Sequence, residues 1–207
     1  MEVAAMQCLS CAATLLVVHG VAAAPKLHDA ASQNNDHTIQ AFLDAGADLN
    51  LRDPATGQTP LMFSVLNGFA ASVRYLLSAG ADTSIGENDG YTPLHGAAFQ
   101  GRADIAKILI DHGLDPNEVH SDGYTPLHRA VLNGHTDTVK ALLNAEVPVD
   151  QPTADGKIAM ELAETLDMAT PVTKAGRRTP GVKSPQLAMK EVLQKFTRPT
   201  SGEKSEL

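Results

Sequence analysis

The sequence predicts an all-α fold made of repeated pairs of antiparallel helices. A Thr-Pro-Leu motif recurs at a spacing of 33 residues, beginning at Thr59, Thr92 and Thr125. Glycines recur between the predicted helices, where a residue in the left-handed conformation commonly ends a helix. Aromatic residues make up only 4% of the 207 residues and Trp is absent. A core of Leu, Ala, Val and Ile suits small helices that stack closely.

Each repeated unit carries signals that start and end two helices. The Thr hydroxyl is expected to cap the first helix, and the Pro that follows occupies a position where a missing N–H costs nothing. Leu and Ala at regular spacing then form the buried face. The first helix is predicted to end at Gly68, Gly101 and Gly134, and the second at Gly46, Gly80 and Gly113.

The pattern continues in weaker form on both sides. Upstream, "LHDAA" from Leu27 matches "LHGAA" from Leu94 at a spacing of 67, which places one additional residue in the loop "RDPATGQ". Downstream, Ile158 stands where the other units have Thr, so its helix cap is predicted to be weaker. The last helix is predicted to be "SPQLAMKEVLQKF", with Ser184 as its N-cap, after an inserted loop over residues 168–184.

A period of 33 with the motif T-P-L-H-x-A resembles the ankyrin repeat. The resemblance covers roughly residues 25–168 and a last helix. It implies an ankyrin-repeat solenoid of antiparallel helix pairs with protruding hairpin loops. The repeats fall near residues 25–57, 58–90, 91–123, 124–156 and 157–196, with the first and last degenerate, in a domain of residues 24–196.

The resemblance implies a non-catalytic module that binds another protein through the hairpin tips and the exposed side of the first helices. The expected partner-binding residues are Leu66, Asn67, Asp89, Tyr91, Phe99, Gln100, Asp122, Tyr124, Leu132 and Asn133. An apolar row flanked by tyrosines and amides is typical of an interface core. The acidic hairpin tips favour a basic or neutral partner peptide. Alternatively, Leu66, Phe99 and Leu132 pack locally against the hairpins.

No catalytic, cofactor-binding or metal-binding site is predicted. His28, His95 and His128 recur with the repeat, and each imidazole is expected to hydrogen-bond the neighbouring Thr and loop backbone. The remaining histidines lack the spacing of a zinc site, and the glycines form no phosphate-binding loop. A net charge of −8 argues against a general nucleic-acid binder.

The charge is unevenly distributed along the chain. Residues 1–168 hold 8 Lys/Arg and 21 Asp/Glu, whereas residues 169–207 hold 8 Lys/Arg and 3 Asp/Glu. The basic part contains Thr179-Pro180 and Ser184-Pro185, where phosphate would offset the positive charge. An alternative function is therefore a regulatory or targeting subunit of an enzyme complex, switched by modification of Thr179 or Ser184.

The two ends of the chain suggest a location. Residues 1–23 have the apolar run and small-residue cleavage site of a signal peptide, although Glu2 replaces the usual basic start and "LLVVHG" also resembles a repeat helix. Residues 197–207 are expected to be a disordered tail ending in KSEL, which resembles the retrieval signal KDEL. The expectation is a monomer in the lumen of the endoplasmic reticulum, without a membrane span. The alternatives are the cytoplasm, or the periplasm if the source is bacterial.

Overall fold

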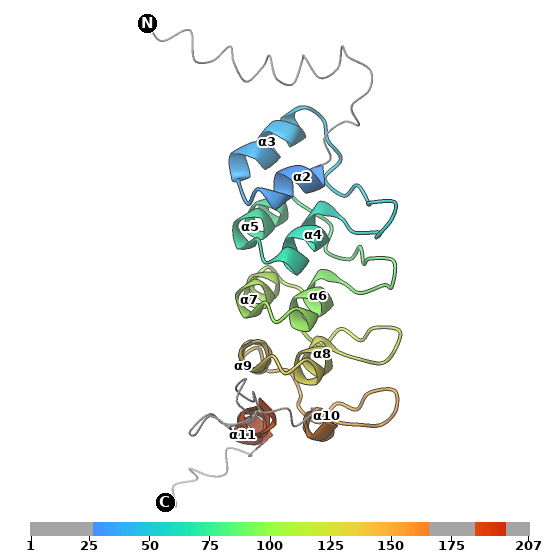
Figure 1. Cartoon of the computed structure of the whole chain (residues 1–207), viewed down its shortest axis with the longest axis vertical. Helices are drawn as coiled ribbons and strands as arrows, with labels where there is room; N and C mark the ends of the chain where they lie inside the picture. The colour runs from blue at the N-terminus through green and yellow to red at the C-terminus, as the bar shows by residue number, and fades with distance from the viewer. Residues whose placement is uncertain (1–26, 166–184, 198–207) are drawn as a thin grey trace, which may run out of the picture. The chain divides into compact units, whose positions relative to one another are not determined.

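Short helices joined by turns and hairpin loops make up the regular structure of this chain (Figure 1). The computed structural model describes residues 27–165 and 185–197. The helices of these residues are α2 (Leu27–Ser32), α3 (Asp36–Asp44), α4 (Pro60–Asn67), α5 (Ala70–Ser78), α6 (Pro93–Phe99), α7 (Ala103–Asp111), α8 (Pro126–Leu132), α9 (Thr136–Leu143), α10 (Ala159–Thr165) and α11 (Pro185–Thr197). All are α-helices and no strand occurs among the described residues, which confirms the predicted all-α class.

The chain divides into two units, Met1–Asp82 and Thr83–Leu207, called unit 1 and unit 2 below. In unit 1, α2 packs on α3 and α4, and α5 packs on α3 and α4. In unit 2, α6 and α8 lie side by side in one row, and α7 and α9 lie side by side in a second row next to it. Helices α10 and α11 continue the first and the second row respectively. Each unit is thus a stack of antiparallel helix pairs.

The core of each unit consists of the aliphatic residues that recur in the sequence. In unit 1 the largest fully buried side chains are Leu27, Ile39, Leu61, Met62 and Leu76. In unit 2 they are Leu94, Ile105, Leu109, Leu127, Leu142, Leu162 and Met189. Between them lie buried alanines such as Ala97 and Ala130, whose small size permits close helix packing.

The predicted Thr caps form at two of three first helices. Thr59 Oγ1 accepts the Met62 N–H at 3.2 Å. Thr125 Oγ1 accepts the His128 N–H at 3.4 Å, and His128 Nδ1 accepts the Thr125 N–H at 3.1 Å. At Thr92 the prediction was wrong, since its side chain caps no backbone N–H. There the hydroxyl donates to Glu118 Oε2 at 2.9 Å and lies 3.0 Å from His95 Nδ1.

Glycines close the helices in the left-handed conformation, as predicted. Gly68 is the C-cap of α4 with φ +83°, whereas Gly101 and Gly134 follow the C-caps Gln100 and Asn133 by one residue. The second helices α3, α5 and α7 are followed by Gly46, Gly80 and Gly113, all with positive φ. Glu146 has φ +60° at the matching position after α9, so this repeat has a side chain where the other repeats have glycine.

The hairpins confirm the predicted insertion. In unit 2, N–H groups bond carbonyls four residues on, from Glu87 to Tyr91, His120 to Tyr124 and Thr153 to Lys157. In unit 1 the corresponding bond joins the Asp53 N–H to the Gln58 carbonyl, five residues on. The additional residue therefore lies inside the turn, where it leaves the two ends of the loop in register.

The last helix pair follows the prediction where the structure describes it. Ile158 offers no side-chain oxygen as a cap, but Glu161 Oε2 accepts the Ile158 N–H at 3.1 Å and satisfies one terminal donor. Helix α11 begins at Pro185 and runs through Thr197, one residue beyond its predicted end. Ser184 and the inserted loop lie outside the described residues. None of the helices in residues 27–165 and 185–197 is long and apolar enough to cross a membrane.

Candidate functional site

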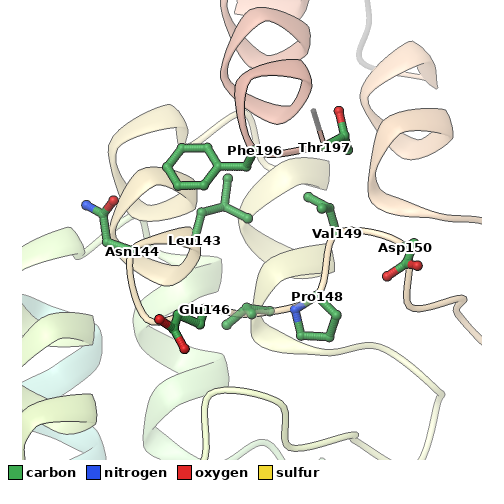
Figure 2. A pocket seen from close by; sticks show the side chains of 9 residues that line it. Leu143, Asn144, Glu146, Pro148, Val149, Asp150, Phe196 and Thr197 are labelled. Carbon is green, nitrogen blue, oxygen red and sulfur yellow. The ribbon is translucent and has the colours of Figure 1, made fainter. Parts of the chain in front are cut away.

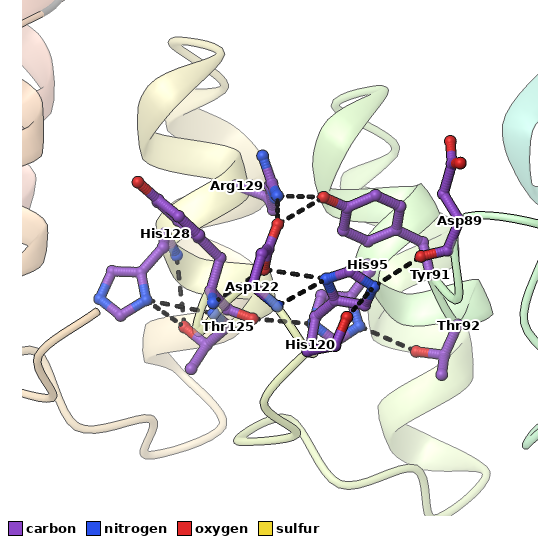
Figure 3. Close-up of polar contacts among 11 residues, drawn as sticks. Asp89, Tyr91, Thr92, His95, His120, Asp122, Thr125, His128 and Arg129 are labelled. Carbon is purple, nitrogen blue, oxygen red and sulfur yellow. Dashed lines mark hydrogen bonds and ion pairs between the residues drawn. The ribbon is translucent and has the colours of Figure 1, made fainter. Parts of the chain in front are cut away.

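A compact group of polar and aromatic side chains joins two neighbouring hairpins of unit 2 (Figure 3). We call it the tyrosine–arginine cluster, consisting of Tyr91, His120, Asp122, Tyr124 and Arg129. Tyr91 and Tyr124 immediately precede Thr92 and Thr125, and so stand at the bases of their hairpins. His120 and Asp122 belong to the second hairpin, and Arg129 lies in α8.

Arg129 is at the centre of the tyrosine–arginine cluster. Its guanidinium carbon lies 4.8 Å from the ring centroid of Tyr91 and 4.6 Å from that of Tyr124, within the range of a cation–π interaction. Its NH2 group donates to Asp122 Oδ2 and to the Tyr91 hydroxyl oxygen. The side chain is only 18% exposed. Arg129 is therefore held in one geometry by two rings and one carboxylate.

Asp122 collects hydrogen bonds from several directions. Tyr91 donates its O–H to Asp122 Oδ2 at 2.6 Å, and the Tyr124 N–H donates to Oδ1 at 3.1 Å. His120 Nδ1 lies 2.9 Å from the same Oδ1. Burial alone would raise the pKa of Asp122, but the bonds from Tyr91, His120 and Tyr124 and the charge of Arg129 together hold that pKa well below its usual value.

Tyr91 is fixed by its ring as well as by its hydroxyl. The His120 ring stacks on it, with centroids 3.9 Å apart and an interplanar angle of 22°. His120 Nε2 lies 2.8 Å from the Asp89 carbonyl oxygen, which joins the two hairpins a second time. Burial, with the hydrogen bond to Asp122, raises the pKa of Tyr91 to about 12. The phenol is therefore neutral and acts as a donor at physiological pH.

The repeat histidines of unit 2 bond as predicted. His95 and His128 are each 1% exposed, and their Nδ1 atoms lie 3.0 Å from Thr92 Oγ1 and Thr125 Oγ1 respectively. Their Nε2 atoms lie 3.2 Å from the Tyr124 carbonyl and 3.0 Å from the Gln151 carbonyl. Burial lowers the pKa of both imidazoles. Among the described residues no group of His, Cys, Asp and Glu could hold a metal ion.

The predicted apolar residues of unit 2 lie at the ends of the first helices. Phe99 is 49% exposed at the end of α6, and Leu132 is half-buried at the end of α8. Leu132 follows Arg129 by three residues, so the two side chains share one face of α8. Gln100 and Asn133 are exposed, and the Asn133 amide donates to the Arg129 carbonyl of its own helix at 2.8 Å.

Unit 1 contains the two remaining predicted residues. Leu66 is half-buried near the end of α4. Asn67 is exposed, and its amide donates to the Phe63 carbonyl at 2.8 Å. The amides of Asn67 and Asn133 thus make the same bond in the two units and stiffen the ends of their helices.

Asp122, which is predicted to belong to an acidic rim, has a side chain that is 33% exposed. Arg129 forms an ion pair with its carboxylate, and His120 Nδ1 lies 2.9 Å from Oδ1, so the charge is offset within unit 2. Its contact with a partner stays a prediction. Asp89 remains exposed in the preceding hairpin, while its backbone carbonyl faces His120.

Sequence reasoning missed two members of the tyrosine–arginine cluster, Arg129 and His120. A signal for Arg129 exists in the repeat alignment, since Gly96 occupies the same position one unit earlier. Arg129 has a long cationic side chain and its counterpart Gly96 has none, while each hairpin base carries a tyrosine. This pattern suggests that the arginine stacks between neighbouring repeats. No comparable signal marks His120, because its role depends on the approach of two hairpins.

Comparison with known proteins connects these features to a family. Models described as "Ankyrin repeats (3 copies)" and "Ankyrin repeats (many copies)" match residues 27–120 and 109–163. Over 64 residues, 31% of this chain and 41% of the relative, the sequence is 38% identical to Protein phosphatase 1 regulatory subunit 27 of Mus musculus. The Homo sapiens protein of that name is 37% identical over 79 residues, 37% of this chain and 49% of the relative.

A third relative is much longer than its match. The Mitochondrial disaggregase of Bos taurus is 38% identical over 81 residues, which are 37% of this chain and 12% of that protein. The chain therefore spans less than half the length of each of these three relatives.

Proposed function

We propose a function on the basis that the chain belongs to the ankyrin-repeat family. Arrays of this kind present rigid surfaces to other proteins. We infer that unit 2 binds a partner protein, without catalysing a reaction, through the exposed side of α6 and α8 and the hairpins that precede these helices.

The observation that carries this proposal is the rigid setting of Arg129 between Tyr91 and Tyr124. Tyr and Arg are the residues most often found at the energetic centre of an interface, and fixing them before binding lowers the entropy cost of association. Phe99, almost half exposed at the other end of α6, supplies apolar area on the same row of helices. With the charge of Asp122 offset internally, the surface favours a neutral or weakly basic partner segment.

Two substitutions test this surface. Phe99→Glu with Leu132→Glu is expected to abolish binding of a partner that co-purifies with the wild-type protein and binds it again when purified. Leu187→Glu is the matched control, because Leu187 on α11 has the same 49% exposure as Phe99. Both proteins should keep the wild-type helical circular-dichroism spectrum. Binding that survives the double substitution, or is lost equally in the control, would remove the proposal.

The relatives favour a second candidate, a regulatory subunit of a phosphatase. It is motivated by identities of 37% and 38% to two proteins named as regulatory subunits of protein phosphatase 1. The test is titration of purified protein phosphatase 1 catalytic subunit with this chain, following both complex formation and dephosphorylation of a peptide. If this chain neither binds the catalytic subunit nor changes its rate at micromolar concentration, this candidate is excluded. Phosphorylation of Thr179 or Ser184, which lie outside the described residues, stays a prediction within it.

For location we propose the lumen of the endoplasmic reticulum, from the signal-like residues 1–23 together with the terminal KSEL. Mass spectrometry of the protein from its native host tests this directly. A mature N-terminus at Ala24, or within one or two residues of it, supports entry into the secretory pathway. An N-terminus at Met1 or Glu2 contradicts it.

A further inference from the structure

An open hollow lies between the turn that follows α9 and the end of α11 (Figure 2). Its volume is about 710 Å³. The residues that line it are Leu143, Asn144, Glu146, Val147, Pro148, Val149, Asp150, Phe196 and Thr197. None of them belongs to the tyrosine–arginine cluster, so the hollow is a separate feature of unit 2.

The internal repeats show that the turn lining this hollow is unusual. At the left-handed position after the second helix, the other repeats have Gly46, Gly80 and Gly113, whereas this repeat has Glu146 with φ +60°. Side chains other than Gly, Asn and Asp are disfavoured in that conformation. A charged side chain is therefore placed at the rim of the hollow at a cost in local stability.

Two further positions differ in the same turn. Asp48 Oδ1 accepts the Asn50 N–H at 2.9 Å, and Asp115 Oδ1 accepts the Asn117 N–H at 2.8 Å. The matching residue in this unit is Pro148, which can make no such bond and instead adds apolar surface. Asp150 stands where the other turns have Asn50 and Asn117, which adds a second carboxylate.

Packing against α11 explains only some of the residues that distinguish the turn after α9 from the matching turns. Val147 is 5% exposed and belongs to the core, and Leu143 is 3% exposed. Phe196, however, remains 39% exposed, Pro148 is exposed, and Val149 is half-buried. Apolar side chains thus surround the hollow without being covered by any described part of the chain.

The charges at the hollow indicate what fits it. Glu146 and Asp150 are both exposed, and neither has an ion-pair partner within the described ranges 27–165 and 185–197. In Figure 2 the two carboxylates stand on opposite sides of Pro148, with Val149 and Phe196 nearby. An apolar floor between two carboxylates is complementary to an apolar side chain with a cation on each side.

We propose that this hollow binds a segment of a partner protein that carries one apolar side chain flanked by Lys or Arg. The apolar side chain enters between Val149 and Phe196, and the flanking cations face Glu146 and Asp150. The surface is separate from that of the proposed function, so each can fail without the other.

A display library of random twelve-residue peptides tests this proposal on the full chain. Peptides are selected on the wild-type protein and depleted on the variant Glu146→Gly/Asp150→Asn. This variant restores the residues of the other turns, so its fold should be retained. The enriched peptides should contain an apolar residue between Lys or Arg. Their affinity should fall about tenfold on the variant and weaken with added salt.

Two controls locate the binding. Asp111→Asn removes an exposed carboxylate elsewhere in unit 2 and should leave peptide affinity unchanged. In amide NMR spectra a selected peptide should shift signals of Asn144–Asp150 and Phe196, and leave those of Tyr91 and Tyr124 in place. Failure to enrich basic–apolar peptides, or shifts confined to the tyrosine–arginine cluster, would overturn the proposal.

Other occupants would also overturn it. Concentration-dependent self-association that the restoring variant abolishes would assign the hollow to a second copy of this chain. Shifts at Glu146 and Phe196 on removal of residues 198–207, with peptide binding appearing only then, would assign it to the chain's own C-terminal segment.

Discussion

The hairpin of unit 1 and the central hairpin of unit 2 are both closed by a bond from an N–H to a later carbonyl, but their acidic residues stabilise them differently. In the hairpin over residues 53–58, Asp53 Oδ1 accepts the N–H groups of Ala55 and Thr56 at 2.9 and 3.2 Å. Arg52 Nε donates to the Gly57 carbonyl at 3.0 Å. These bonds join residues that are at most five positions apart in the sequence.

In the hairpin over residues 120–124, the acidic residue instead bonds residues outside its own hairpin, all of them in unit 2. Asp122 accepts from Tyr91, 31 positions earlier, and pairs with Arg129 of the following helix. His120 stacks on Tyr91 as well. The named bonds of Asp53 lie within its own turn, whereas those of Asp122 depend on side chains that only the stacked helix pairs of unit 2 bring together. Substitutions should therefore have larger effects on the second hairpin.

The largest expected effect is a loss of stability in mild acid. His95 bonds the Tyr124 carbonyl at the base of the unit 2 hairpin, and His128 bonds the Gln151 carbonyl. Burial lowers the pKa of both, so below about pH 6.5 the unfolded chain takes up protons that the folded chain does not. Stability is complete above that pH and falls as pH decreases, with a slope of up to about 2.7 kcal/mol per pH unit for two protons.

Urea unfolding at pH 8, 7, 6 and 5 measures this slope. The variant His95→Gln/His128→Gln, which keeps hydrogen-bonding groups but cannot titrate, should have a lower stability at pH 8 and a flatter profile. A profile as steep as that of the wild type would show that these histidines do not cause the effect. The paired carboxylate of Asp122, whose pKa is lowered, should contribute a further loss only below about pH 4.

The second prediction compares the two hairpins directly. Arg129→Ala removes a charge-assisted hydrogen bond and two ring contacts, and should lower the free energy of unfolding by about 2 kcal/mol. Asp53→Ala removes the turn bonds to Ala55 and Thr56 and should cost about 1 kcal/mol. Urea denaturation gives both values, and hydrogen exchange locates the loss of protection for Arg129→Ala at residues 91–132. Equal losses of unfolding free energy for the two substitutions would contradict the distinction between local bonds and bonds between neighbouring helix pairs.

The third prediction uses matched hydroxyls in the second helices. In unit 1 Ser72 Oγ donates to the Ala31 carbonyl at 2.9 Å, so Ser72→Ala should destabilise by about 1 kcal/mol. In unit 2 the matching Thr138 is fully buried, and its Oγ1 has no partner among the described residues. Thr138→Val should therefore stabilise by about 1 kcal/mol, because the isosteric methyl needs no hydrogen bond. Thermal unfolding measures both, and destabilisation by Thr138→Val would indicate that its hydroxyl is satisfied.

The smallest effect concerns Glu146, the residue that replaces a glycine at the end of α9. Glu146→Gly relieves the positive φ but adds entropy to the unfolded chain, so a net stabilisation of about 0.5 kcal/mol is expected. Gly113→Glu is the converse change in the neighbouring turn and should destabilise, although no atom would obstruct its Cβ. Opposite signs for the two substitutions in denaturation curves would support the role of φ, and equal signs would contradict it.

The helices, their order and their closing turns could be predicted from the sequence alone. Thr-Pro starts, left-handed glycines and aliphatic spacing act within a few residues, so Thr59, Gly68 and Leu61 could be placed without a structure. The spacing of 67 also placed the additional residue in the loop "RDPATGQ", residues 52–58. The structural roles of His95 and His128 followed from the repeat in the same way.

Which side chains meet between neighbouring helix pairs could be seen only in the folded structure. Thr92 matches Thr59 and Thr125 in sequence, yet its hydroxyl bonds Glu118 because that carboxylate comes from the next turn. In the sequence Asp122 appears as a free hairpin charge. In the structure it forms an ion pair with Arg129, which occupies the position that Gly96 has one repeat earlier. A repeat fixes which positions become neighbours, but the contact formed depends on both occupants and on the space between them. The surface chemistry of this chain was therefore not predictable from its period.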